Sequence, residues 1–272
     1  MLSLGWFSTG RGPGSRGLLS YAMSAIARGE LDARIAYVFC NREPGEHAGS
    51  DQFMALARGY GLPLVTFSSR RFRREHRARV SQIRAEHDRR ILDLVSPYHI
   101  DLCVLAGYML IVSGELCSRL PMVNLHPALP GGPTGTWQEV IWKLLGERAA
   151  ETGAMVHLVT EALDEGPAIS YTSFAVRGPS YDVLWSSLDG QSVDDVKAAE
   201  GEDLPLFKAI RAEGVQRECP LLLETLIALA KADVRVHGGR VTDARGDTLP
   251  PLCLNDAVQR RIGTNVRARD VR

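Results

Sequence analysis

The sequence predicts a Rossmann-like α/β fold, in which helices flank a mostly parallel sheet. Through the first half of the chain, short apolar runs alternate with stretches of helical spacing, as they do in βαβ units. A glycine-rich turn separates the first apolar run from the first helical stretch. The run at 101–106 is apolar on both faces, which is typical of a central parallel strand.

Each expected element follows from a change of period along the chain. Apolar runs predict strands at 2–7, 35–40, 64–67 and 101–106, and helical spacing predicts helices at 18–28, 52–60 and 77–95. A second block continues with a short strand at the start of 123–133, a helix at 139–145 and alternating segments at 154–160 and 168–176. We therefore expect the sheet to extend past its parallel core.

The rest of the second half has weaker patterns. Residues 178–205 are rich in Gly, Pro, Asp and Ser and predict a long loop or surface insertion. Residues 221–230 predict a helix, and 234–249 predict a polar hairpin with a Gly-Gly turn, so we expect the fold to carry a C-terminal hairpin/helix extension. We expect a single domain over 1–272.

Composition excludes several functional classes. The 272 residues are 45% hydrophobic and 24% charged, as in an ordinary globular protein, and Lys plus Arg equals Asp plus Glu at 32 each. No overall field then favours nucleic acid or an anionic membrane. The apolar start is too short for a signal peptide, no apolar stretch reaches the ~20 residues of a membrane helix, and the five cysteines lack CxxC spacing. We expect a cytoplasmic protein without nucleic-acid or membrane partners.

A basic run, Arg70-Arg71-Phe72-Arg73-Arg74, is the one feature that suggests nucleic acid. Positive charge with an interleaved aromatic ring can hold a phosphate backbone. The alternative is a solvated helix entrance balanced by Glu75 and Glu86, and the zero net charge favours that interpretation.

The glycine-rich turn is a candidate phosphate site. Glycines let backbone amides approach an anion, and the helix that follows adds a positive dipole. The candidate phosphate ligands are Gly10, Arg11, Gly12, Gly14, Ser15 and Arg16. The turn matches neither the dinucleotide fingerprint nor the P-loop spacing, so a glycine loop that binds nothing is the alternative.

Two further segments carry polar residues that suit chemistry. Asn124 and His126 stand two apart in a short strand, so their side chains point to the same side. Asp164 lies in an acidic turn between two strand-like segments. The alternatives are a satisfied polar pair at a strand end and a carboxylate that caps backbone amides.

Together, these elements resemble the folate-dependent formyltransferase family, and within it the phosphoribosylglycinamide (glycinamide ribonucleotide) formyltransferases of purine biosynthesis. The resemblance covers nearly the whole chain and includes Ser8-Thr9-Gly10, Val38-Phe39-Cys40-Asn41, Val104-Leu105-Ala106-Gly107-Tyr108-Met109, Asn124-Leu125-His126-Pro127, Thr152-Gly153-Ala154-Met155-Val156-His157, Leu163-Asp164-Glu165-Gly166-Pro167 and Gly246-Asp247-Thr248-Leu249-Pro250-Pro251. Several spaced motifs in order are more specific than any one of them.

The resemblance implies a one-carbon transferase that uses 10-formyltetrahydrofolate as co-substrate and no metal. It assigns catalysis to Asn124, His126 and Asp164, and substrate phosphate binding to the glycine-rich turn. Its folate-binding residues are Tyr108, Met109, Leu110, Ile111, Val112, Val159, Thr160, Leu163, Glu165 and Gly166. Glu218 matches a further substrate contact more loosely. The implied halves are 1–110 for the nucleotide and 111–272 for folate and catalysis, and a homodimer is left open.

Some positions depart from the family pattern, mainly around the substrate pockets. Pro13 lengthens the phosphate turn, Arg16 replaces an expected Asn, and Leu110 replaces a residue that is commonly Arg. Residues 42–51 and 178–205 are additional, and the loop after His126 is one residue short. A relative that formylates another amine, such as an amino sugar nucleotide, a formyltetrahydrofolate hydrolase, and a nucleotide-binding module without turnover therefore stay open.

Overall fold

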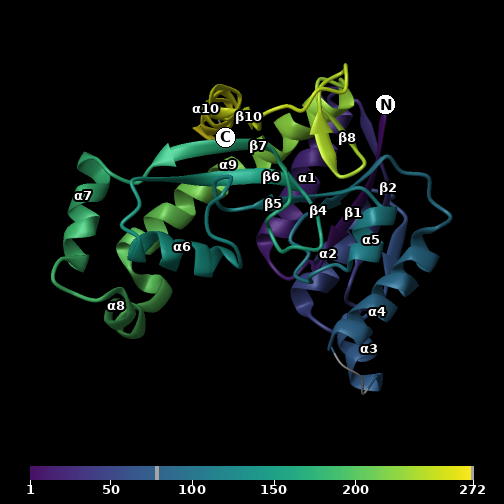
Figure 1. Ribbon diagram of the computed structural model, residues 1–272, viewed down its shortest axis with the longest axis horizontal. Helices are drawn as coiled ribbons and strands as arrows, with labels where there is room; N and C mark the ends of the chain where they lie inside the picture. Colours follow the sequence, from purple (N-terminus) through teal and green to yellow (C-terminus); the bar gives the residue numbers. More distant parts are fainter. Residues whose placement is uncertain (77–79, 271–272) are drawn as a thin grey trace.

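A twisted sheet of eight strands runs through the centre of the protein in the computed structural model, which describes residues 1–76 and 80–270 (Figure 1). Its order is β10-β7-β6-β5-β4-β1-β2-β3. The strands are β1 (Leu2–Ser8), β2 (Ala33–Cys40), β3 (Leu64–Thr66), β4 (Leu102–Leu105), β5 (Met122–His126), β6 (Glu151–Leu158), β7 (Ala168–Ala175) and β10 (Leu252–Cys253).

The strands are mostly parallel, as predicted. From β3 through β2, β1 and β4 to β5 all pairs are parallel. Strand β6 then runs antiparallel to both of its neighbours, and β10 is parallel to β7 at the edge. The sheet therefore does continue past its parallel core, and its direction changes next to β5.

Helices cover both faces because the central strands are apolar on both sides. Trp6 of β1 packs into the core under α1 (Pro13–Ala27), α2 (Ala48–Gly59), α9 (Pro205–Ala230) and α10 (Asn255–Asp270). Phe7, the next residue, packs into the opposite core under α4 (Val80–Val95) and α5 (Gly114–Arg119). The short helix α3 (Ser69–Glu75) packs on α4. The expected helix 77–95 is found from Val80 onward, and 77–79 fall outside the described residues.

A third apolar cluster lies beyond the antiparallel end of the sheet, on the left in Figure 1. It joins α6 (Trp137–Gly146), α7 (Pro179–Trp185), α8 (Val193–Ala199) and the first half of α9. Trp142, Trp185 and Phe207 are buried in it. The prediction of a loop at 178–205 is thus wrong. The segment contains two helices and two short 3-10 turns, at Ser186–Leu188 and Gly201–Asp203. The segment is too short and polar to show a period, but its few apolar side chains are enough to fold it.

Two helix starts also differ from expectation. Helix α1 begins at Pro13 rather than at 18, because proline suits the first helical position, where its missing N–H is not needed. Helix α9 begins at Pro205 and continues through Pro220, so the predicted helix 221–230 is only its second half. Helix α10 was not expected.

The predicted polar hairpin is present. It consists of β8 (Arg235–His237) and β9 (Arg240–Thr242), and Gly238 and Gly239 at its turn have φ of 56° and 74°. Positive φ at both central residues is what a tight hairpin turn demands. Across the described residues, none of the helices has the length and apolar content of a bilayer-crossing segment.

Close packing at Gly153 of β6 gives a test of the sheet. A Cβ at this position would lie 2.0 Å from the Thr172 carbonyl oxygen of β7. We expect Gly153→Ala to destabilise the protein by about 1–3 kcal/mol or more, seen as a lower midpoint of thermal unfolding. Gly214→Ala is the matched control, because a Cβ there meets nothing within 4 Å and alanine favours the helix by about 1 kcal/mol. Equal midpoints for the two variants would contradict the packing of β6 on β7.

Candidate active site

Two polar side chains share one face of β5 at its carboxyl end. Val123 and Leu125 point into the core under α1 and α9, so Asn124 and His126, which alternate with them, point to the opposite face. The antiparallel register places Asn124 opposite His157 of β6. Asn124 Nδ2 lies 3.2 Å from His157 Nε2. Strand pairing thus adds a second imidazole to the predicted pair.

The loop after β6 folds back over the same strands and carries Asp164. The Leu158 N–H donates to the Pro167 carbonyl at 2.9 Å and closes the base of the loop. Asp164 has a φ of 57°, which aspartate tolerates better than most residues. Gly166 admits no side chain, because a Cβ would lie 1.7 Å from the Leu158 carbonyl oxygen. This tight backbone turns the Asp164 carboxylate toward the histidines.

Asp164 contacts groups from three segments, and its side chain is only 7% exposed. Its Oδ2 lies 3.5 Å from His126 Nδ1 and accepts the Gly135 N–H at 3.2 Å. Its Oδ1 accepts from Asn124 Nδ2 at 3.3 Å and lies 3.6 Å from His157 Nε2. Burial acts to raise the pKa of Asp164, but the hydrogen bond with His157, the nearby His126 and the Gly135 amide outweigh it and lower that pKa. The carboxylate is therefore ionised.

His126 has a hydrogen-bond acceptor on each side of its ring. Nε2 donates to the Pro133 carbonyl at 2.8 Å, and Nδ1 faces Asp164. Because a carbonyl only accepts, the neutral ring carries its proton on Nε2 and presents the Nδ1 lone pair to the carboxylate. Burial lowers the pKa of His126, and the opposing effects of Pro133 and Asp164 do not cancel it. Nδ1 is thus a proton acceptor beside a negative charge.

The loop between β5 and α6 supplies the backbone groups of this centre. Gly135 has a φ of 110°, a conformation that glycine adopts readily and that turns its N–H to Asp164. Thr136 follows as the N-cap of α6 and forms a capping box with Glu139. The start of α6 therefore fixes where the loop ends.

The predicted phosphate residues lie together after β1, partly as a turn and partly as the first turn of α1. Gly12 is the extended N-cap without a side-chain cap, and the space above Gly12 and Gly14 is open. Ser15 is buried, and its hydroxyl lies against Gly107, which follows β4. Arg16 donates to the Gly49 carbonyl at 3.4 Å. The turn lies between β1 and β4, where strand order reverses and α/β proteins bind ligands.

The predicted folate residues divide by exposure. Tyr108 and Val112 are buried in the core under α4, so their backbone alone can face a ligand. Met109, Ile111 and Leu163 are exposed apolar side chains, at 57%, 40% and 45%. The Met109 N–H also donates to Thr9 Oγ1 at 2.8 Å, which ties this segment to the phosphate turn.

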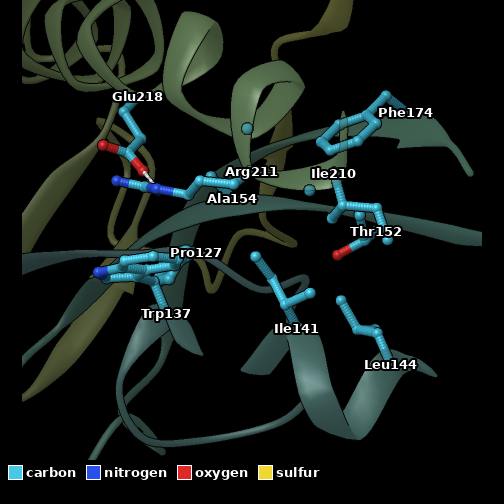
Figure 2. A pocket seen from close by; sticks show the side chains of 12 residues that line it. Pro127, Trp137, Ile141, Leu144, Thr152, Ala154, Phe174, Ile210, Arg211 and Glu218 are labelled. Atoms are coloured by element: carbon cyan, nitrogen blue, oxygen red, sulfur yellow. Dashed lines mark hydrogen bonds and ion pairs between the residues drawn. The ribbon is translucent and has the colours of Figure 1, made fainter. Parts of the chain in front are cut away.

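Glu218 lies on α9, in the wall of a cavity of about 20 Å³ whose lining includes Pro127 and Trp137 (Figure 2). Its carboxylate pairs with Arg211 at 2.5 Å. The looser prediction thus falls on a residue that is already paired, next to the loop that follows His126.

Two residues that touch Asp164 were missing from the predicted set, His157 and Gly135. His157 ends one of the motifs that resemble the family, Thr152 to His157. Its contact with Asp164 depends on the antiparallel register of β6, which a single sequence does not reveal. Gly135 contributes only a backbone N–H, so its side chain gives no signal. Within the described residues, no three His, Cys, Asp or Glu side chains gather closely enough to hold a metal ion.

Comparison with known proteins finds relatives of this chain. The chain is 26% identical over 168 residues to the phosphoribosylglycinamide formyltransferase of Schizosaccharomyces pombe, covering 59% of this chain and 76% of that one. It is 31% identical over 145 residues to the formyltetrahydrofolate deformylase of Mycobacterium tuberculosis, covering 52% of this chain and 40% of that one. The fold matches the solved phosphoribosylglycinamide formyltransferase of Coxiella burnetii with a TM-score of 0.66 at 20% identity, over 93% and 99% of the two chains.

The chain also matches a protein family as a whole. Residues 14–180 match the formyl transferase family, and this range holds the second half of the glycine-rich turn, the end of β5 and the Asp164 loop. Because the match covers more than half of the chain, the protein belongs to the formyl transferase family.

Proposed function

We propose that the protein transfers the formyl group of 10-formyltetrahydrofolate to the amine of glycinamide ribonucleotide. The observation that carries the proposal is the contact of Asn124 and His126 with one buried carboxylate, Asp164, at the end of β5. The names of the relatives from Schizosaccharomyces pombe and Coxiella burnetii support the acceptor. The phosphate of the ribonucleotide is assigned to the open N-terminus of α1 and the folate to the exposed side chains of Met109 and Leu163.

The centre suits attack of an amine on a formyl carbon. That attack forms a tetrahedral species with a developing oxyanion, which hydrogen-bond donors must stabilise. Asn124 is the donor proposed for this role. In the free protein its amide lies between Asp164 and His157, so donation to the oxyanion exchanges one of these partners for substrate.

The surplus proton of the amine goes to His126. Its Nδ1 lone pair faces Asp164, and protonation there converts a neutral ring beside a carboxylate into an ion pair. Both ring N–H groups then have acceptors, Asp164 and the Pro133 carbonyl. The imidazolium formed in this way can return its proton to the leaving folate nitrogen.

A deformylase is the second candidate. Relatives at 31% identity are formyltetrahydrofolate deformylases, although the chain spans only 40% of their length. The same centre can direct water instead of an amine at the formyl carbon. Arg16, which replaces the expected Asn in the phosphate turn, favours a changed acceptor.

The organisation of the chain, its location and its assembly belong to this proposal as well. The division into a nucleotide half, 1–110, and a folate half, 111–272, follows from the sites assigned above. A cytoplasmic location fits the use of folate in purine biosynthesis. The sequence leaves a homodimer open, and the mass of the protein in solution tests it.

The first prediction separates the two activities. We expect 10-formyltetrahydrofolate, or its dideaza analogue, to lose its formyl group only when glycinamide ribonucleotide is present. The absorbance change of the folate on deformylation measures this reaction. Equal rates with and without the ribonucleotide would identify a deformylase. Absence of turnover under both conditions, with folate still bound, would favour a binding module.

The second prediction concerns Asp164. Asp164→Asn keeps an acceptor for the Gly135 N–H but removes the charge that stabilises protonated His126, so kcat/KM should fall by about 10²–10⁴-fold. The control is Asp189→Asn, because the Asp189 side chain is 71% exposed and pairs with Arg148 at the surface. An Asp164→Asn variant that keeps more than a tenth of wild-type kcat/KM would exclude the assigned role.

The third prediction concerns pH. The pKa of His126 is lowered from 6.5, and the ring must be neutral to take the proton, so the acid limb of kcat/KM should have its midpoint below pH 6.5. The native state also binds fewer protons than the unfolded chain in that window, so stability should fall as pH drops from 6.5 through the lowered pKa. Titration of the His126 ring signal by NMR checks the value; a midpoint at or above 6.5 would contradict it.

A further inference from the structure

The loop from Pro127 to Thr136 carries two backbone groups on which the centre depends. The Pro133 carbonyl accepts the proton of His126 Nε2 at 2.8 Å, and the Gly135 N–H donates to Asp164 at 3.2 Å. Neither group is held by its own side chain. Their positions depend on what anchors the two ends of the loop.

The far end of the loop is anchored by α9. Trp137, the first residue of α6, lies under the guanidinium of Arg211, whose central carbon is 4.6 Å from the centre of the indole ring. Arg211 is itself held by Glu218, two turns along the same helix, at 2.5 Å. Figure 2 shows these three side chains around the cavity that Pro127, at the near end of the loop, also lines.

The contacts of Arg211 with Trp137 and Glu218 fix the position of the indole ring. The side chains of Arg211 and Glu218 are 27% and 15% exposed, so their ion pair is shielded more than a surface pair. A planar guanidinium can stack on an indole and pair with a carboxylate in one conformation, which an ammonium group cannot do. Trp137 also packs on Phe207 of α9, at 5.8 Å between ring centres.

We propose that Arg211 is a positioning residue for formyl transfer: by holding Trp137 against α9, it sets the Pro127–Thr136 loop and with it the backbone groups that bind His126 and Asp164. The inference rests on the proposed function, but its geometry concerns the free protein. Arg211 acts through Trp137 and touches none of the three assigned catalytic side chains.

Helix α9 offers a matched control. Arg217 also pairs with a glutamate of the same helix, Glu213, at 2.7 Å, and its guanidinium carbon also lies 4.6 Å from an aromatic ring, Phe174. That ring belongs to β7 and not to the loop after β5. Arg211→Lys and Arg217→Lys therefore remove the same type of contact, and only the first concerns the loop.

The test compares these two variants in kinetics and in the titration of His126. We expect Arg211→Lys to lower kcat by about 10–10²-fold, with KM for the formyl folate within twofold of wild type. We also expect the titration midpoint of His126, which Asp164 and His157 also influence, to shift, because a displaced loop admits water and moves the Pro133 carbonyl away from the ring. Arg217→Lys should change neither quantity.

A double-mutant cycle identifies the route. If Arg211 acts through Trp137, then Trp137→Leu reproduces the loss and adds little to Arg211→Lys. Unchanged kcat and an unchanged titration midpoint of His126 in Arg211→Lys would overturn the proposal. Equal losses of kcat in Arg211→Lys and Arg217→Lys, in proportion to a lower midpoint of thermal unfolding, would overturn it too. If the wild-type protein has no acceptor-dependent turnover, the proposed function fails, and the His126 titration still decides the role of Arg211.

Discussion

The Asp164 carboxylate is the group around which the site is organised. A buried carboxylate is costly unless both of its oxygens are paired, and the polar groups that approach this one come from β5, β6 and the loop before α6. These segments are far apart in sequence. They meet because β6 reverses direction beside β5, which sets His157 opposite Asn124, and because the loop after β6 folds back over the same strands.

The charge state of the centre suits the reaction proposed for it. Asp164 is ionised and His126 is neutral, since environment lowers the pKa of both. The pair thus carries one buried negative charge that a proton on Nδ1 would neutralise. A base with a lowered pKa is weak, but the ammonium group of a tetrahedral adduct is a strong acid and readily transfers its proton to His126. Burial therefore keeps the ring neutral until the proton arrives, and the carboxylate then holds it.

The fold could be predicted from the sequence where a local pattern determines structure. The apolar runs predicted the parallel strands, and alternation placed Asn124 and His126 on one side. The resemblance added Asp164, which no spacing pattern connects to β5. The prediction of a loop at 178–205 was wrong because tertiary packing determines the structure there. These residues form helices because Trp185, Leu188 and Val196 are buried against α6 and α9. His157 was missed for a related reason, since register is not visible in one sequence.

The segment 178–205 packs against elements that border the site. Helices α7 and α8 pack on α6 and on the first half of α9 through buried aromatic and aliphatic side chains. Helix α6 begins directly after the loop that binds His126 and Asp164, so this support limits how far the loop can move. The exposed side chains of Met109 and Leu163 follow β4 and β6, and Tyr108 beside them packs under α4, away from this cluster. Changes within 178–205 should therefore act on the loop after His126 and on the neighbouring end of α9, where Glu218 lies, before they reach the folate segments.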